Sequence, residues 1–182
     1  MTQQRPRLED LEAIRHRYAA ERDKRIRQDG NDQYVEIAGD LTRYVDDPYV
    51  EPGFQRDPVD KAVDALIIGG GFGGLLAGAR LRQAGVKDIC IVEKGGDFGG
   101  TWYWNRYPGA RCDSESHSYA YFFSKELLEE WEWSERYPGH AEIRRYLNHV
   151  ADRFDLKRDM QFDARVTAAH YSDTKQDWTV ET

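Results

Sequence analysis

Residues 62–74 read Ala-Val-Asp-Ala-Leu-Ile-Ile-Gly-Gly-Gly-Phe-Gly-Gly. The run that ends at Ile68 is short and apolar and leads directly into glycines, as a buried strand of a parallel sheet does. Residues 75–81, Leu-Leu-Ala-Gly-Ala-Arg-Leu, predict a helix, and residues 88–93, Asp-Ile-Cys-Ile-Val-Glu, predict a second buried strand. Together these segments predict one βαβ unit of about 30 residues.

The turn between the first strand and the helix satisfies the pattern G-x-G-x-x-G at Gly69, Gly71 and Gly74. The first glycine permits a tight turn, the second lets the backbone approach a pyrophosphate, and the third permits close helix–strand contact. The pyrophosphate would lie at the helix N-terminus, where free N–H groups and the helix dipole favour negative charge. The pattern therefore indicates an α/β fold, a Rossmann-like dinucleotide-binding domain with a parallel sheet.

An acidic residue, Glu93, ends the second strand, 19 residues after Gly74. A carboxylate at this place accepts hydrogen bonds from a ribose diol and repels a 2′-phosphate, which favours FAD or NAD over NADP at this site. The following loop, residues 95–104, is rich first in glycine and then in aromatic residues, as expected around a flat isoalloxazine ring. Because aromatic clusters also form ordinary cores, these residues alone leave FAD and NAD open.

The longer stretch 99–116 reads Gly-Gly-Thr-Trp-Tyr-Trp-Asn-Arg-Tyr-Pro-Gly-Ala-Arg-Cys-Asp-Ser-Glu-Ser. It resembles the loop that follows the FAD fingerprint in Baeyer–Villiger monooxygenases. These class B flavoprotein monooxygenases turn ketones into esters or lactones with NADPH and O2, through a C4a-peroxyflavin. The resemblance covers about residues 62–182, and the run Thr101–Asp113 is its most specific part. N-oxygenating flavin monooxygenases share the glycine pattern but lack this run, and they are the alternative within the superfamily.

The resemblance implies roles for the residues at matching positions. The turn Gly69–Gly74 would bind the FAD pyrophosphate, Glu93 the ribose, and Thr101–Trp104 the flavin side. Asp113 is the expected catalytic residue, a carboxylate beside the flavin that pairs with an arginine from the NADP domain. The implied contacts to FAD or NADPH involve Gly69, Gly71, Phe72, Gly73, Gly74, Glu93, Thr101, Trp102, Tyr103, Trp104, Arg111, Cys112, Asp113, Tyr119 and Val166.

Simpler interpretations stay open at several of these positions. Asp113 could cap a backbone turn, and Arg111 could form an ion pair with Glu115 or Asp113. Cys112 is expected to be a small buried side chain rather than a nucleophile, because no histidine stands near it in the sequence. Val166 is expected to touch the adenine end as a backbone contact from a strand edge.

Two domains are predicted, an N-terminal extension (1–60) and the N-terminal portion of an FAD-binding domain (61–182). Within residues 5–27, apolar residues at helical spacing among charges predict an amphipathic helix, docked as an arm. Residues 29–60 hold nine acidic residues against two arginines, with glycines and prolines that predict an irregular wrap. After the loop we expect helices over 125–133 and 140–154, a third sheet strand over 160–162, and strands over 165–171 and 178–182 that begin a β-meander.

Composition excludes other classes of protein. The 182 residues carry a formal net charge of −7 with no concentrated basic patch, which argues against a nucleic-acid partner. No apolar run approaches the roughly 20 residues of a membrane helix, and two cysteines are too few for a disulfide framework, so a cytoplasmic location is expected. The histidines are too scattered for a metal site.

The expected partners are a small-molecule ketone and O2, with the oligomeric state open. Because enzymes of this family are several hundred residues long and carry a second glycine pattern for NADPH, the chain is interpreted as their N-terminal part, inactive by itself. An NAD-linked oxidoreductase and a non-enzymatic remnant remain alternatives.

Overall fold

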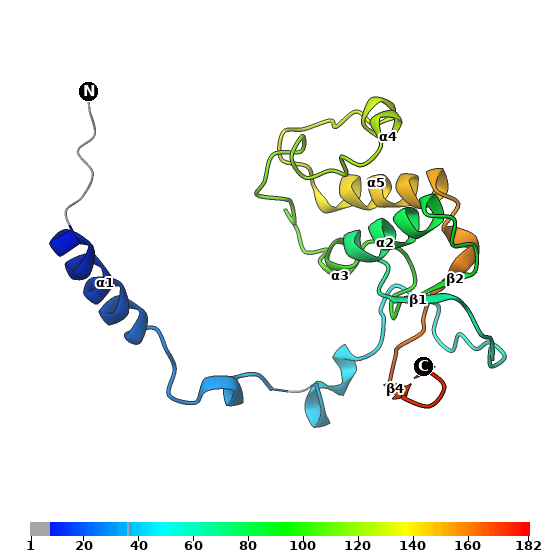
Figure 1. The fold of residues 1–182 in the computed structure, drawn as a ribbon, viewed down its shortest axis with the longest axis horizontal. Coiled ribbons are helices and arrows are strands. Elements are labelled where there is room, and N and C mark those ends of the chain that lie inside the picture. Colours follow the sequence, from blue (N-terminus) through cyan, green and yellow to red (C-terminus); the bar gives the residue numbers. More distant parts are fainter. Residues whose placement is uncertain (1–7, 36) are drawn as a thin grey trace. The chain divides into compact units, whose positions relative to one another are not determined.

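The computed structural model describes residues 8–35 and 37–182, and the chain divides into two compact units, Met1–Asp46 and Asp47–Thr182. The first unit holds helix α1 (Leu8–Asp23) and two short 3-10 helices, η1 (Gly30–Gln33) and η2 (Gly39–Tyr44) (Figure 1). The predicted N-terminal helix and the irregular segment after it are confirmed over these residues. Ile14 and Tyr18 of α1 are exposed, so the docking of this arm stays a prediction.

The second unit is built on a parallel sheet of three strands in the order β1 (Ala65–Ile68), β2 (Ile89–Val92) and β3 (Met160–Gln161). Ile67 lies opposite Ile91, and Ile91 lies opposite Met160. The predicted Rossmann-like βαβ unit and the third sheet strand are thus confirmed. β3 is one residue shorter than expected.

One face of β1 differs from the prediction of a buried strand. Ala65 and Ile67 face the main core, whereas Leu66 and Ile68 are 37% and 61% exposed. β1 lies at one end of the sheet order, and Leu66 and Ile68 belong to neither of the two buried clusters. The same face of β2 is buried because Val63, Ala164 and Val166 pack against Cys90 and Val92.

Helices α2 (Phe72–Gln83) and α5 (His140–Arg153) lie side by side on the other face (Figure 1). α2 begins three residues earlier than the segment predicted from its apolar residues, directly within the glycine turn. α5 is confirmed and places apolar side chains at helical spacing in the core. The fully buried ones are Ile143, Tyr146, Leu147, Val150 and Ala151.

The helix predicted over 125–133 ends early. Its helical part, α4 (Lys125–Glu130), is capped by Ser124, whose Oγ accepts a hydrogen bond from the Leu127 amide. Trp131 already has extended backbone angles, and it packs with Trp133 against the buried ring of Tyr146, with ring centroids 5.3 and 4.9 Å from that ring. Packing of these two rings on the core therefore overrides the helical pattern.

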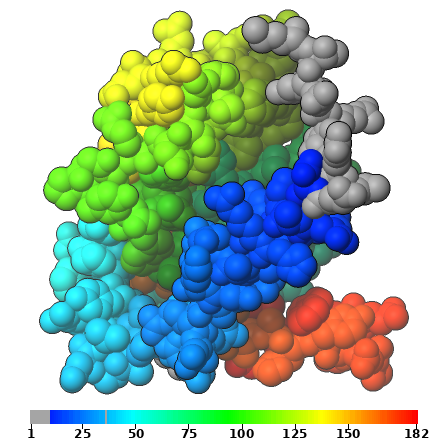
Figure 2. Space-filling view, turned by 90° about the vertical axis from the view of Figure 1, so that its left-hand side faces the viewer, coloured from blue at the N-terminus to red at the C-terminus, as the bar shows by residue number. Residues whose placement is uncertain are grey.

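The chain finishes with η3 (Lys157–Asp159) before β3 and with an antiparallel hairpin of β4 (Ala168–Ser172) and β5 (Asp177–Glu181). The hairpin confirms the start of a β-meander, and Figure 2 shows it in orange and red. β4 begins three residues later than predicted, because residues 164–166 run along β2 instead. The Ala164 amide donates to the Glu93 carbonyl at 2.9 Å.

We predict that Gly78→Val lowers the free energy of unfolding by about 1–3 kcal/mol. A Cβ at Gly78 would already lie 3.1 Å from both Ile91 Cδ1 and Leu156 Cδ2, so further carbons would push α2 from the sheet. Urea unfolding measures the change. The matched control is Gly73→Ala, where nothing lies within 4 Å and stability should hold or rise. An equal effect of both substitutions would contradict the close packing at Gly78.

Candidate functional site

The glycine turn leads from β1 into α2 with the geometry that its pattern predicts. Gly69 has a φ of +100°, a conformation that other residues rarely adopt. A Cβ at Gly74 would overlap the Gly69 carbonyl oxygen, so only glycine permits this approach of helix and strand. Gly71 precedes α2, and no side chain caps the helix there. The first N–H groups of α2 are therefore available to an anion.

Glu93 lies beside this turn and is only 5% exposed. Its Oε2 accepts a hydrogen bond from the Gly70 amide at 2.6 Å, and its Oε1 accepts one from the Gly95 amide at 2.7 Å. A carboxylate offers about four lone-pair directions, so two remain for further donors such as ribose hydroxyls. Glu93 thus joins the loops that follow β1 and β2.

The loop after β2 touches the glycine turn through backbone atoms. The Gly99 amide donates to the Gly70 carbonyl at 3.1 Å. Gly100 has a φ of +52°, and a Cβ there would lie 3.1 Å from the Gly71 Cα. Sequence reasoning placed Gly99 and Gly100 in a glycine-rich loop but missed that they form the second wall of the turn. The only feature of the sequence that pointed to this role was the position of both glycines next to the aromatic run that begins at Trp102.

Three predicted aromatic residues meet at the N-terminus of α2. The ring of Phe72 lies 4.9 Å from that of Tyr119, and the ring of Trp102, on α3 (Thr101–Trp104), lies 5.9 Å from it on another side. The Trp102 Nε1 donates a hydrogen bond to the Tyr119 hydroxyl at 3.0 Å. The structure therefore brings a rigid aromatic group to the end of the glycine turn.

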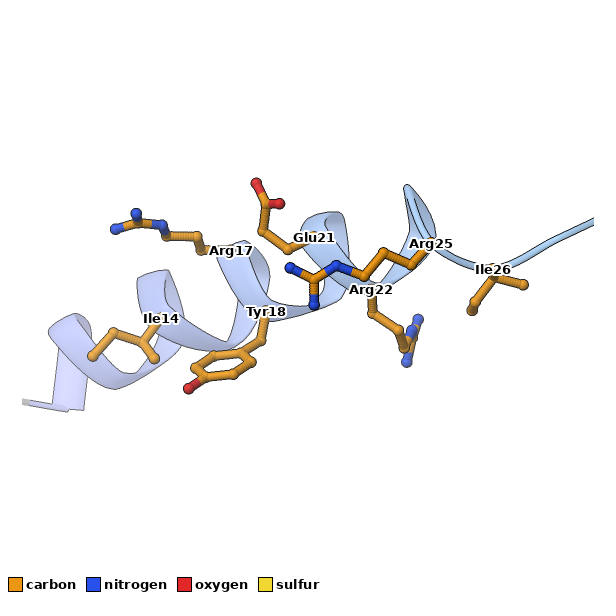
Figure 3. Close-up of a pocket in the computed structure, with 7 residues that line it drawn as sticks. All are labelled: Ile14, Arg17, Tyr18, Glu21, Arg22, Arg25 and Ile26. Carbon is orange, nitrogen blue, oxygen red and sulfur yellow. The ribbon is translucent and has the colours of Figure 1, made fainter. Parts of the chain in front are cut away.

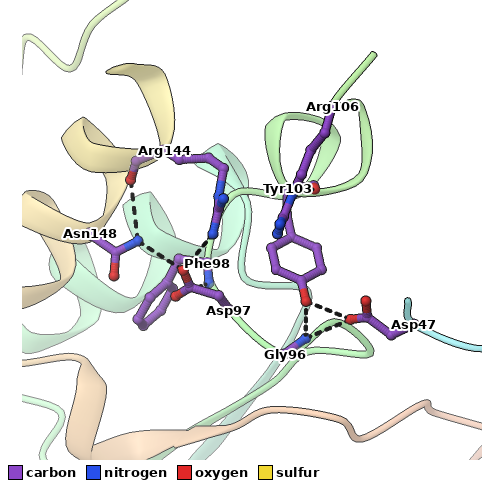
Figure 4. A network of polar contacts seen from close by, with 8 residues as sticks. All are labelled: Asp47, Gly96, Asp97, Phe98, Tyr103, Arg106, Arg144 and Asn148. Atoms are coloured by element: carbon purple, nitrogen blue, oxygen red, sulfur yellow. Dashed lines mark hydrogen bonds and ion pairs between the residues drawn. The ribbon is translucent and has the colours of Figure 1, made fainter. Parts of the chain in front are cut away.

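The other residues of α3 point elsewhere. Thr101 is exposed, and Trp104 lies under the Lys94 ammonium, 4.8 Å from its ring centroid. The Tyr103 hydroxyl donates to Asp47 Oδ2 at 2.6 Å (Figure 4). The pKa of Tyr103 is raised to about 12, chiefly because burial disfavours the phenolate and also because its proton is bound to Asp47. Contact of Thr101, Tyr103 or Trp104 with a cofactor stays a prediction.

Arg111, Cys112 and Asp113 occupy three different environments. Arg111 Nη1 lies 2.7 Å from Glu135 Oε2 and also donates to the Tyr137 carbonyl, so its ion-pair partner is neither of the two expected acids. Cys112 is buried at 4% exposure, as predicted. Asp113 is exposed, and within the described part of the chain its carboxylate forms no hydrogen bond or ion pair. The capping role considered for Asp113 is therefore not observed.

Val166 is half-buried and packs against Cys90 and Val92 on the face of the central strand β2. It precedes β4 rather than belonging to a strand, which corrects the predicted strand edge. Among residues 8–35 and 37–182, no group of three or more His, Cys, Asp or Glu side chains could hold a metal ion. No helix of the described residues is long and apolar enough to cross a membrane.

An open hollow of about 580 Å³ runs along the end of α1 in the first unit (Figure 3). Its side chains point in different directions from one helix and the turn after it, and no glycine-rich backbone lines it. A nucleotide phosphate would find no cluster of backbone N–H donors there. The hollow is lined by Ile14, Arg17, Tyr18, Glu21, Arg22, Arg25 and Ile26.

Comparison with known proteins agrees with this geometry. Residues 67–130 match the family of NAD(P)-binding Rossmann-like domains. A Baeyer–Villiger monooxygenase of Streptomyces coelicolor is 47% identical over 175 residues, which cover 96% of this chain and 28% of that protein. The chain thus spans less than a third of the length of this relative.

Solved structures similar to the chain include two with bound NADP. One is an oxidised steroid monooxygenase bound to NADP, with 52% identity and a TM-score of 0.63 over 65% of this chain and 22% of that one. The other, OTEMO in complex with FAD and NADP, has 44% identity and a TM-score of 0.61 over 67% of this chain and 23% of that one.

We predict that stability falls between pH 10 and about 12 in part because Tyr103 ionises there. Its pKa is raised above the ordinary 10, so the protonated phenol stabilises the fold fully below pH 10, and this contribution is lost as the pH approaches 12. Ultraviolet titration of phenolate should lose one late-ionising group in Tyr103→Phe, and the stability of that variant should fall less steeply. Identical titration curves would contradict the environment of Tyr103.

We also predict that Asp113→Ala changes the free energy of unfolding by no more than about 0.5 kcal/mol, because the fold makes no use of this carboxylate. The matched variant is Glu93→Ala, which leaves two amides without their acceptor and should cost about 2 kcal/mol or more. Urea unfolding compares the two. A large loss of stability in Asp113→Ala would restore the capping role.

Proposed function

Because nearly the whole chain matches the N-terminal part of Baeyer–Villiger monooxygenases, we propose that it is the FAD-binding part of an NADPH- and O2-dependent monooxygenase that oxidises ketones to esters or lactones. The observation that carries the proposal is the contact of two glycine loops, at Gly71 and Gly100, joined by the Glu93 carboxylate. This site combines backbone donors, an acceptor for hydroxyls and nearby aromatic rings.

The residues present fit FAD. Its pyrophosphate needs N–H donors and close backbone, which the uncapped start of α2 and the glycine turn offer. Its ribose needs an acceptor, which Glu93 offers. Its isoalloxazine ring needs apolar walls, for which Phe72, Trp102 and Tyr119 are the candidates. When bound, FAD supplies the electron transfer to O2, and the residues of this chain bind and orient it.

NADPH requires a different place on the protein, because Glu93 would repel its 2′-phosphate from the glycine turn. We propose that the segment Arg111–Asp113 borders NADPH, since the side chains of Arg111 and Asp113 are exposed and remain accessible beside the core. The buried Cys112 thiol anchors this segment in the core rather than taking part in chemistry.

Asp113 is the proposed catalytic residue. Its carboxylate carries a charge that no described group of this chain neutralises. A cation from the rest of the protein, such as the arginine implied by the family, would find an unpaired partner there and would be oriented by it. Within the chain, we propose 61–182 as the cofactor-binding domain, with 1–60 as its extension.

We further propose a cytoplasmic location. Cys90 and Cys112 are both free and buried, as expected for thiols that are kept reduced and form no disulfide framework. A small-molecule ketone and O2 are the proposed substrates.

We predict that Gly71→Val abolishes FAD retention by the 182-residue chain. A Cβ at Gly71 would already lie 3.4 Å from the Gly100 Cα. The valine methyl groups would therefore extend into the space that the pyrophosphate needs. Flavin absorbance after removal of free FAD measures the loss. The control is Ala84→Val at the exposed end of α2, which should retain flavin. Equal flavin content in wild type and Gly71→Val would contradict the role of the turn.

A further inference from the structure

The segment that enters the second unit, Asp47–Val50, contacts the loop after β2. Asp47 Oδ2 accepts hydrogen bonds from the Tyr103 hydroxyl at 2.6 Å and from the Gly96 amide at 2.9 Å. The Gly96 amide also lies 3.1 Å from the Tyr103 hydroxyl, so the three groups form a closed triangle (Figure 4). One carboxylate thereby fixes both the backbone of the loop and the first turn after it.

Rings and a cation support this triangle. Tyr49 meets Tyr103 edge to face, with ring centroids 5.6 Å apart. The Arg106 guanidinium carbon lies 3.4 Å from the Tyr49 ring centroid and 4.5 Å from that of Tyr103, and its Nε donates to the Tyr103 carbonyl at 2.8 Å. Tyr103 is therefore held at its ring, its hydroxyl and its backbone.

The fit of this segment against the loop is close. A Cβ at Gly96 would overlap Val50, so the two backbones can approach only because residue 96 lacks a side chain. Farther along the same segment, Arg56 donates to the carbonyls of Phe162 and Asp163, and the Asp163 amide donates to the Gly95 carbonyl at 3.1 Å. Residues 47–56 thus hold this loop at two points.

The loop held in this way is the wall of the proposed cofactor site. Its Gly99 amide is bonded to the Gly70 carbonyl, and its Gly100 lies against Gly71. On the opposite side, Arg144 from α5 anchors the neighbouring Asp97 at 3.0 Å (Figure 4). Glycines supply no side chains with which to fix themselves, so the loop depends on these external anchors.

We propose that Asp47 is a positioning residue for FAD binding. It holds residues 95–104 against the glycine turn through the Tyr103 hydroxyl and the Gly96 amide, without touching the cofactor. This inference rests on the proposed function. Asp47 precedes the predicted FAD-binding domain, so the affinity for FAD would depend on a segment outside that domain. The reason is that a loop that is already ordered loses less conformational entropy when it closes on a ligand.

The test compares Asp47→Ala with Asp46→Ala in the 182-residue chain. Asp46 carries the same charge one residue earlier and is exposed, and it forms none of these contacts. Titration with FAD should show about tenfold weaker binding in Asp47→Ala, as expected for losing hydrogen bonds to a charged group, and no change in Asp46→Ala. Asp47→Asn keeps an acceptor oxygen and should recover part of the affinity.

A second comparison separates positioning from general stability. Tyr103→Phe should weaken FAD binding in the wild-type background and have no further effect in Asp47→Ala, because both remove the same hydrogen bond. Without FAD, hydrogen exchange of the amides of residues 95–104 should be faster in Asp47→Ala than in Asp46→Ala.

The outcomes are distinguishable. Absence of FAD binding by the wild-type chain would overturn the proposed function, and the exchange comparison would then decide by itself whether Asp47 orders the loop. Equal exchange in the two alanine variants would overturn the inference. Faster exchange in Asp47→Ala with unchanged FAD affinity would also overturn it, because the order of the loop would then not govern binding.

Discussion

The Glu93 carboxylate makes the interactions on which the carboxyl end of the sheet depends. Two adjacent parallel strands end at the same edge, and their loops would otherwise leave it in separate directions. Each oxygen of Glu93 accepts an amide from one of these loops, Gly70 after β1 and Gly95 after β2. At 5% exposure this carboxylate is screened from water, so its hydrogen bonds hold the loops strongly.

The arrangement of the two loops follows from these hydrogen bonds to Glu93. Once the loops are joined, Gly71 and Gly100 meet backbone to backbone, with no side chain of their own between them. The anchors then lie outside the contact, with Asp47 on one side and Arg144 on the other. Glycines line the site, and charged side chains from distant parts of the sequence restrict the conformations of these glycines.

Local pattern was sufficient to predict much of this structure. The βαβ unit, the turn geometry at Gly69 and Gly74 and helix α5 all depend on residues near in sequence. What could not be predicted depends on distant partners. Arg111 bonds Glu135 rather than a near acid, and Tyr103 turns to a carboxylate 56 residues before it. The exposed face of β1 likewise depends on distant packing, because Val63, Ala164 and Val166 pack against Cys90 and Val92 of β2 instead.

Three carboxylates, Glu93, Asp47 and Asp113, divide into two kinds by the hydrogen bonds that they accept. Glu93 and Asp47 each accept two or more hydrogen bonds from the fold, so their charges are committed to holding loops. Asp113, exposed on the motif that resembles the family most closely, accepts none within the described chain. An ion pair between Asp113 and a cation from elsewhere would therefore disrupt no existing hydrogen bond. The same ion pair at Glu93 or Asp47 would detach a loop. A charge pair formed at Asp113 would therefore leave the Glu93 and Asp47 contacts of the two glycine loops intact.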